Sequence, residues 1–251
     1  MKSSITPHLP VSLYRVLCDL RSGRPPLGWA KFGHLRRLNP INPDFGFGRG
    51  LPIDRYYIEK FLTKHSRDIQ GHVLEIKEPL YTHRFGGDRV TKSDVLHVEP
   101  GNPHATLVAD LTQAEHLSAD TADTFDCIIL TQTLPFIYDV KAAVNTLHRI
   151  LKPGGVLLAT VPGISQISSE DMERWGQYWC FTTRSMEQLL ATVFFPDQVT
   201  VATHGNVLAA IALLHGLVTE ELKPEELNYV DPNYQVLITA RAVKGSITNG
   251  D

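Results

Sequence analysis

Acidic and polar side chains recur at the ends of short apolar runs in this sequence. In an open α/β sheet, ligands bind beyond the carboxyl ends of the parallel strands, so residues there are the candidates for chemistry. A carboxylate at the second strand can hold the hydroxyls of a ribose, and we expect Asp94 to do so. Any single acid would serve equally well as a helix cap, but the order of the set favours a nucleoside-type cofactor cleft. The set consists of Glu75, Asp94, Asp110, Thr131 and Gln132.

Seven strand-like runs alternate with helical patterns along the chain. The clearest helix covers residues 140–151, where apolar side chains repeat with helical spacing after a capping Asp139. Strands that alternate with helices predict an α/β fold, here a Rossmann-like, seven-stranded, mostly parallel sheet with helices on both faces. The predicted strands are residues 72–76, 90–98, 105–109, 125–130, 156–161, 199–203 and 235–242. The other predicted helices are residues 11–20, 53–62, 184–194 and 206–222.

The first fifty residues differ from the rest of the chain. They are rich in Pro, Gly and Arg and carry only the one short helical pattern. We interpret residues 1–50 as an N-terminal extension, either a tail or a lid over the cofactor. Residues 51–245 are expected to form the main domain, and residues 246–251 a flexible tail.

The composition argues against several classes of protein. The net charge of −3 does not provide the basic excess that nucleic-acid binding needs. The three widely spaced cysteines indicate neither a disulfide framework nor a metal site. Neither a signal-peptide pattern nor an apolar stretch of membrane-spanning length is present, so we expect a cytoplasmic protein without a membrane partner. A homo-oligomer remains open.

Two motifs stand at a fixed spacing on either side of a predicted helix. Residues 125–130 read Phe-Asp-Cys-Ile-Ile-Leu, and after the helix residues 151–158 read Leu-Lys-Pro-Gly-Gly-Val-Leu-Leu. This pair resembles the motifs of the class I S-adenosylmethionine-dependent methyltransferases. Asp110-Leu111 resembles the acidic motif on the adenine side. The resemblance covers residues 50–242 and implies the class I methyltransferase fold, with S-adenosylmethionine (SAM) or its product S-adenosylhomocysteine (SAH) as the ligand.

Three further segments resemble a bacterial subgroup of that family found near glycosyltransferases. They are residues 49–57, 85–87 and 175–179. This likeness implies a sugar or another small metabolite as the acceptor. Arg55 then lies where the family folds over the methionine end of the cofactor, and its guanidinium is a candidate for binding the cofactor carboxylate.

The first family motif is altered. An acid followed by a glycine-rich loop is expected, but Lys77 and Pro79 stand at the glycine positions after Glu75. Glycine permits close backbone approach and a positive φ, whereas proline removes a donor. Gly86-Gly87 are candidates for rebuilding part of the loop. The cofactor-binding residues that we expect are Arg55, Glu75, Lys77, Tyr81, Asp94, Asp110, Leu111, Thr131 and Gln132.

Candidates for catalysis and acceptor binding are fewer. Methyl transfer to oxygen often uses a general base, and His97, Tyr138 and His215 are candidates for it. A histidine common in relatives after the fourth strand is replaced by residues 134–136, Leu-Pro-Phe. The aromatic residues Trp175, Tyr178 and Trp179 follow the fifth strand and suit stacking against a sugar or a planar acceptor, or simple packing over the sheet edge.

Three functions remain compatible with these residues. The first is SAM-dependent O-methylation of a sugar or small metabolite. The second is changed chemistry on the same fold, such as cyclisation or isomerisation, and the third is a non-catalytic binding or scaffold role, because fold alone does not fix function.

Overall fold

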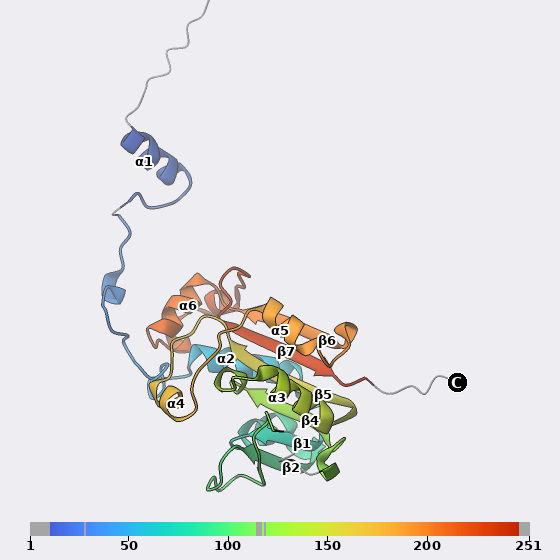
Figure 1. Ribbon diagram of the computed structural model, residues 1–251. Coiled ribbons are helices and arrows are strands. Elements are labelled where there is room, and N and C mark those ends of the chain that lie inside the picture. Colours follow the sequence, from blue (N-terminus) through green and yellow to red (C-terminus); the bar gives the residue numbers. More distant parts are fainter. Residues whose placement is uncertain (1–10, 28, 114–116, 118, 246–251) are drawn as a thin grey trace, which may run out of the picture. The chain divides into compact units, whose positions relative to one another are not determined.

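The structure, a computed structural model, describes residues 11–27, 29–113, 117 and 119–245 (Figure 1). The chain forms two compact units, Met1–Asn39 and Pro40–Asp251. The smaller unit contains helix α1 (Val11–Arg21), as the sequence predicts. The larger unit begins at Pro40, earlier than the predicted boundary at residue 51, and the predicted tail at 246–251 lies outside the described residues.

A single seven-stranded sheet organises the larger unit. Its strand order is β3-β2-β1-β4-β5-β7-β6, and β7 alone runs antiparallel to its two neighbours. The predicted mostly parallel sheet is therefore confirmed. The strands are β1 (Gly71–Ile76), β2 (Val90–His97), β3 (Leu107–Val108), β4 (Phe125–Thr131), β5 (Leu151–Pro162), β6 (Val199–His204) and β7 (Leu237–Val243).

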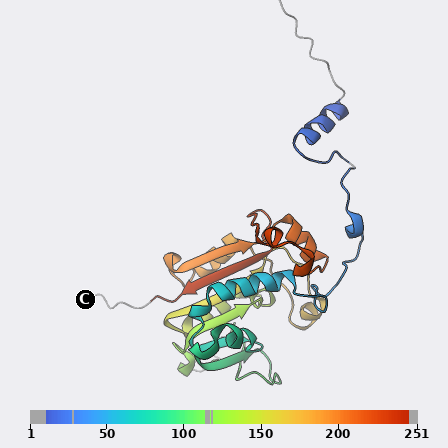
Figure 2. The same ribbon diagram turned by 180° about the vertical axis from the view of Figure 1, so that it is seen from behind.

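Helices cover both faces of this sheet. One face packs against α3 (Val140–Ile150) and α5 (Thr183–Leu190), which share an apolar core with β4 and β5 (Figure 1). Figure 2 shows the opposite face covered by α2 (Ile53–Lys64) and α6 (Val207–Leu214). Two short helices, α4 (Ser169–Arg174) and α7 (Pro224–Asn228), complete the larger unit.

Local sequence explains how β4 and β5 are joined. The Asp139 side chain accepts a hydrogen bond from the backbone N–H of Ala142 (3.0 Å) and so caps α3. The buried side chains of α3 fall on one face of the helix, as the spacing predicts. Within β5, Gly154 adopts a φ of 80°, where the register shifts between the pairs Phe125–Leu151 and Cys127–Val156.

Two predicted helices end earlier than expected. The pattern at 206–222 forms a helix only to Leu214, because Gly216 adopts a φ of 65° and its N–H bonds to the carbonyl of Leu213 (2.9 Å). The predicted helix at 184–194 ends at Leu190. It begins at Thr183, one residue earlier than predicted, because Thr182 and Ser185 cap one another at its start.

Candidate functional site

A turn directly after β1 opens the carboxyl edge of the sheet. Lys77 adopts a φ of 76° there, in the left-handed region that favours glycine. Its N–H donates to the carbonyl of Leu96 (3.0 Å), and its carbonyl accepts from the Asn102 side chain (2.7 Å). The Lys77 side chain is exposed. Lys77 therefore adopts the backbone conformation that is expected of a glycine at this turn.

The carboxylate of Glu75 holds the loop that follows this turn. Glu75 is only 3% exposed. Its oxygens accept hydrogen bonds from the N–H of Tyr81 (3.0 Å), the N–H of Thr82 (2.7 Å) and the Thr82 hydroxyl (2.7 Å). Burial raises the pKa of Glu75, and the hydrogen bonds from Thr82 and Tyr81 oppose that rise. These bonds make Glu75 a positioning residue for residues 77–82.

Asp94 does not lie at the end of a strand. It lies within β2, which continues to His97, and its carboxylate contacts His72 Nε2 (2.5 Å) and Lys92 Nζ (3.1 Å). The predicted strand 90–98 already contains Asp94, and the structure likewise places it inside β2, so its ribose role stays a prediction. Two residues beyond the strand stands Glu99, which the prediction missed although it directly follows the apolar run.

Glu99 is available to a ligand at this edge. Its side chain is 52% exposed, and its one ion pair in the described chain is with Arg174 Nη2 (3.3 Å), itself 56% exposed. Exposed pairs of this kind contribute about 0–1 kcal/mol, so a ligand can displace Arg174 easily.

The ends of β3 and β4 lie along the same edge. Asp110 Oδ1 accepts from the N–H and the hydroxyl of Thr112, both at 2.8 Å, and Leu111 beside it is buried. Thr131 is the last residue of β4. Gln132 follows with a φ of 50°, its N–H donating to the carbonyl of Thr160 (2.9 Å). The structure thus brings the ends of β1, β2, β3 and β4 to one edge of the sheet as predicted, and Glu99 lies just beyond the end of β2.

Arg55 lies in the first turn of α2 next to the loop after β1. Its Nη1 donates to the Tyr81 hydroxyl (3.3 Å), and its guanidinium lies over the Phe47 ring at 5.8 Å. Burial raises the pKa of the neighbouring Asp54.

Gly86-Gly87 do not rebuild the loop, since they lead into the amino end of β2 at Val90, away from the carboxyl edge.

The predicted aromatic cluster divides into two groups. Trp175 lies edge-on to His97 at the end of β2, with ring centroids 5.8 Å apart, and Arg174 stacks on it. Trp179 instead stacks with Tyr138 (6.0 Å), which also meets Tyr178 edge-on (5.3 Å). We call Tyr138, Tyr178 and Trp179 the aromatic wall. The segment from Trp175 to Trp179 therefore runs along the carboxyl edge of the sheet, between the end of β5 and the end of β2.

The three candidate bases occupy different surroundings. His97 Nδ1 lies 2.8 Å from the carbonyl of Glu99 and so fixes the chain after β2. Tyr138 is the most exposed of the aromatic wall. His215 ends α6, and its carbonyl accepts from Ile41 and Asn42. Among the described contacts, His215 is thus tied to residues 41 and 42, and its role as a base stays a prediction.

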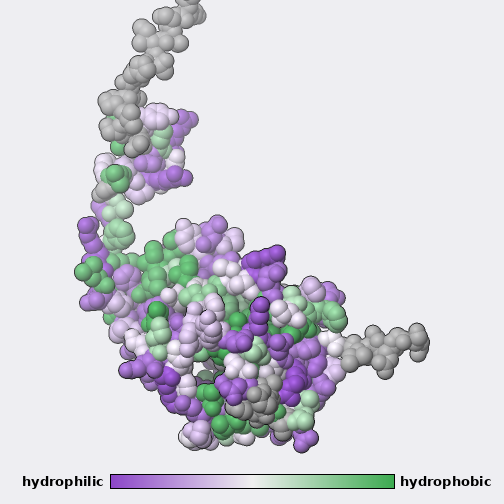
Figure 3. All heavy atoms as spheres, in the orientation of Figure 1, coloured by the Kyte–Doolittle hydropathy of each residue, from purple (hydrophilic) through white to green (hydrophobic). Residues whose placement is uncertain are grey.

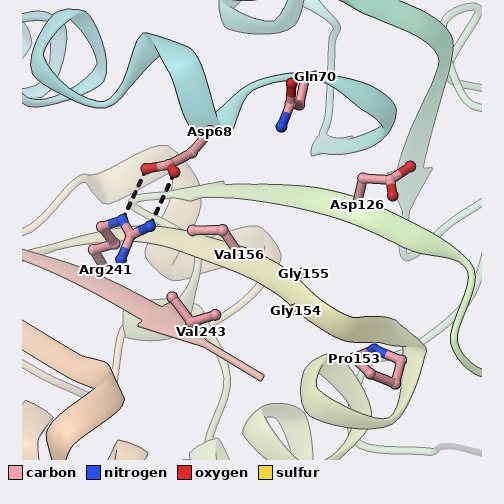
Figure 4. Close-up of a pocket in the computed structure, with 9 residues that line it drawn as sticks. All are labelled: Asp68, Gln70, Asp126, Pro153, Gly154, Gly155, Val156, Arg241 and Val243. Carbon is pink, nitrogen blue, oxygen red and sulfur yellow. Dashed lines mark hydrogen bonds and ion pairs between the residues drawn. The ribbon is translucent and has the colours of Figure 1, made fainter. Parts of the chain in front are cut away.

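A polar pocket of about 270 Å³ occupies the opposite, amino edge of the sheet (Figure 4). Asp126 near the start of β4 and Val243 at the end of the antiparallel β7 both line it, which places it away from the strand ends just described. At one side of the pocket, Arg241 donates hydrogen bonds to the Asp68 carboxylate through Nε (2.8 Å) and Nη2 (2.9 Å), as Figure 4 shows. This pocket is structural rather than part of the candidate site.

Asp68→Asn should reveal the strength of that ion pair. The hydrogen bonds from Arg241 hold the pKa of Asp68 below its usual range. A depressed folded-state pKa adds stability that is present above the unfolded pKa of about 4 and is lost as the pH falls through the folded value. We expect the variant to lose about 1.5–3 kcal/mol in urea unfolding near pH 7. An equal difference at pH 7 and below pH 3 would contradict this.

Lys77→Gly should stabilise the protein. A non-glycine residue in the left-handed region costs about 1–2 kcal/mol, which glycine avoids while giving back part of the gain through a looser unfolded chain. We expect a gain of about 1 kcal/mol, measured as a rise in Tm of about 2–4 °C. Lys77→Ala is the matched control, because it removes the charge but retains Cβ and should give no gain. A rise with alanine equal to that with glycine would assign the effect to charge.

Within the described residues, no helix has the length and apolar character to cross a membrane, and no group of three or more His, Cys, Asp or Glu side chains is placed to hold a metal ion.

Comparisons with known proteins agree with this architecture. The sequence matches a family described as a methyltransferase domain over residues 59–195. Curated proteins give no match. Among solved structures, the chain resembles the N-methyltransferase NodS from Bradyrhizobium japonicum WM9 in complex with SAH, with a TM-score of 0.51 and 16% identity over 82% of this chain and 94% of that one.

Two further structures are similar to the same degree. A putative methyltransferase from Thermobifida fusca YX gives a TM-score of 0.50 and 16% identity over 79% of this chain and 84% of that one. A putative sarcosine dimethylglycine methyltransferase from Galdieria sulphuraria gives a TM-score of 0.50 and 12% identity over 76% of this chain and 86% of that one. At these identities the likeness establishes the fold. The family match covers more than half of the chain and includes the strand ends described above, so the protein belongs to the class I SAM-dependent methyltransferase family.

Proposed function

We propose that this protein transfers a methyl group from SAM to an oxygen of a sugar or another small metabolite. The observation that carries the proposal is the turn at Lys77, which keeps the backbone of a glycine-type cofactor loop although the glycine itself is absent. Family membership supports the cofactor, and the exposed aromatic wall supports a small acceptor with apolar surface.

The residues at the carboxyl edge fit the cofactor. Glu99 would accept hydrogen bonds from the ribose hydroxyls, once its weak pair with Arg174 opens. Asp110 and Leu111 would flank the adenine, and Arg55 would bind the carboxylate of the methionine end. The other residues assigned to this site are Lys77 through its backbone, Tyr81, Thr131 and Gln132, with Glu75 holding the loop in place.

The chain's own contribution to the reaction is alignment and exclusion of water. When bound, the cofactor supplies an electrophilic methyl group on a sulfonium centre. Transfer needs the acceptor oxygen in line with that methyl group, and holding the two together replaces a costly encounter. Tyr138 and Trp179 would stack on the acceptor, while Trp175 and Phe47 would close the edge of the cleft. Residues 40–50 would act as part of this lid, since Gln166 Nε2 donates to the carbonyl of Pro43 (2.5 Å).

Acceptor-dependent production of SAH tests the proposal. The full chain is incubated with SAM and a panel of sugars, nucleotide sugars and small hydroxylated metabolites, and SAH is quantified. We expect one class of acceptor to raise SAH above background. Trp179→Ala should then lower turnover about tenfold and leave cofactor affinity within about twofold, because a stacked aromatic contact is worth about 0.5–1.5 kcal/mol beyond its burial. Loss of both together would assign Trp179 to folding.

A binding role without transfer is the second candidate. The ion pair between Arg174 and Glu99, with Trp175 against His97, occupies the ribose side of the cleft and favours it. Changed chemistry on the same fold stays a further alternative. Absence of cofactor binding with the fold intact would favour the non-catalytic role, and a new product with SAM unconsumed would select changed chemistry.

A further inference from the structure

Charge is distributed very unevenly along this chain. Residues 11–39 contain six basic residues and one acidic residue, whereas residues 40–251 contain 17 basic and 26 acidic residues. The net charge of −3 therefore hides a strongly basic N-terminal segment attached to an acidic domain. Such an asymmetry indicates that the segment meets an anionic partner.

The same segment exposes large apolar side chains. Leu13, Leu17 and Leu20 lie on one face of α1 and are 44%, 47% and 51% exposed. Figure 3 shows hydrophobic and hydrophilic residues side by side on this helix. Beyond it the exposed apolar residues are Leu27 (100%), Trp29 (64%), Phe32 (59%) and Leu38 (104%). Basic residues alternate with these from Arg21 to Arg37.

We propose that residues 11–39 bind the surface of an anionic lipid bilayer. Leucine and phenylalanine side chains would enter the boundary between headgroups and acyl chains, the indole of Trp29 suits that depth, and the basic side chains would meet the anionic headgroups. Nucleic acid would account for the basic and aromatic residues, but it has no apolar region in which the leucine face of α1 could be buried. A helix of 11 residues is also marginal in water by itself, and a bilayer surface would stabilise it.

This inference is independent of the proposed methyl transfer and replaces the expectation that the protein has no membrane partner. That expectation depended on the absence of a signal-peptide pattern and of an apolar stretch long enough to span a bilayer. Binding at the surface needs neither a net positive protein nor a span, because lipid charge acts only within about a Debye length of 8 Å in physiological salt.

Co-sedimentation of the full chain with vesicles tests the proposal. Vesicles of phosphatidylcholine alone are compared with vesicles containing about 30 mol% phosphatidylglycerol. We expect binding only to the second kind, falling with added salt. Replacing Arg36 and Arg37 by glutamate should lower partitioning about tenfold or more, since each basic residue near such a surface contributes about 1 kcal/mol, which is about fivefold in affinity. Leu13→Ser with Leu17→Ser and Leu20→Ser should abolish it.

The chain offers a matched control for the leucine variant. Leu208, Ile211 and Leu214 form an equally exposed stripe on α6, visible as a green patch in Figure 3. The acidic Glu225 and Glu226 lie beside Leu208, which disfavours an anionic surface. Serine at these three α6 positions should leave vesicle binding unchanged. Loss of binding with the α6 variant alone, equal binding to neutral vesicles, or binding to a single-stranded oligonucleotide but to no vesicle would each overturn the proposal.

Discussion

Glu99→Gln is expected to weaken SAH binding about 10- to 100-fold. A hydrogen bond from a ribose hydroxyl to a carboxylate is worth about 1.5–3 kcal/mol, and the amide would retain only part of it. Calorimetric titration of SAH into the wild-type and variant proteins measures the loss. Since the Glu99 side chain is exposed and holds only a weak pair with Arg174, the substitution should leave the melting temperature nearly unchanged.

Asp94→Asn is the matched control for that experiment. Its carboxylate is engaged inside β2 by His72 and Lys92, so the change should affect stability and leave SAH affinity within about threefold. The two variants thus compare the acid within the strand with the acid just beyond its end. A large loss of affinity in Asp94→Asn and none in Glu99→Gln would return the ribose role to Asp94.

Glu75→Ala is expected to cause the largest loss of stability, at least about 3 kcal/mol. It leaves the N–H groups of Tyr81 and Thr82 and the Thr82 hydroxyl without their acceptor, and each buried unsatisfied group costs about 1–3 kcal/mol. Urea unfolding measures the free energy. Because the same bonds hold the loop after Lys77, cofactor affinity should fall together with stability.

Thr82→Val separates the loop bonds in this second prediction. It removes only the hydroxyl donor and keeps both backbone bonds to Glu75, so it should cost about 1 kcal/mol and retain cofactor binding. A cost in Glu75→Ala no larger than that in Thr82→Val would contradict the account of Glu75 as the anchor of the loop.

The sheet and its main helices could be predicted from the sequence because burial of one face makes apolar residues recur at a regular spacing. The apolar repeat of α3 and the continuous apolar run of β4 leave few alternatives, and the connecting LKPGG motif fixes where the chain turns. The short helix α6 shows the limit of this signal. Its apolar residues continue past Leu214, and the stop depends on the backbone of Gly216.

The site was harder to predict because its residues depend on local backbone geometry and on tertiary contacts. Lys77 suggested the loss of the loop, yet the surrounding bonds to Leu96 and Asn102 keep it in a glycine-like conformation. Asp94 lies inside the predicted strand 90–98 and Glu99 just beyond it, and only the structure shows that His72 and Lys92 engage the Asp94 carboxylate. Nothing in the spacing of Trp175 and Trp179 indicates that they face different ends of the cleft.

Titration of SAM and SAH into the full wild-type chain and into Lys77→Gly tests the central claim most directly, which is that the altered loop still forms a cofactor site. We expect saturable binding of one ligand per chain in both proteins. Glycine should tighten SAM binding more than SAH binding, because only SAM carries a sulfonium charge that the nearby lysine opposes, screened by salt. The absence of saturable binding of either ligand in both proteins, with the fold intact, would contradict it.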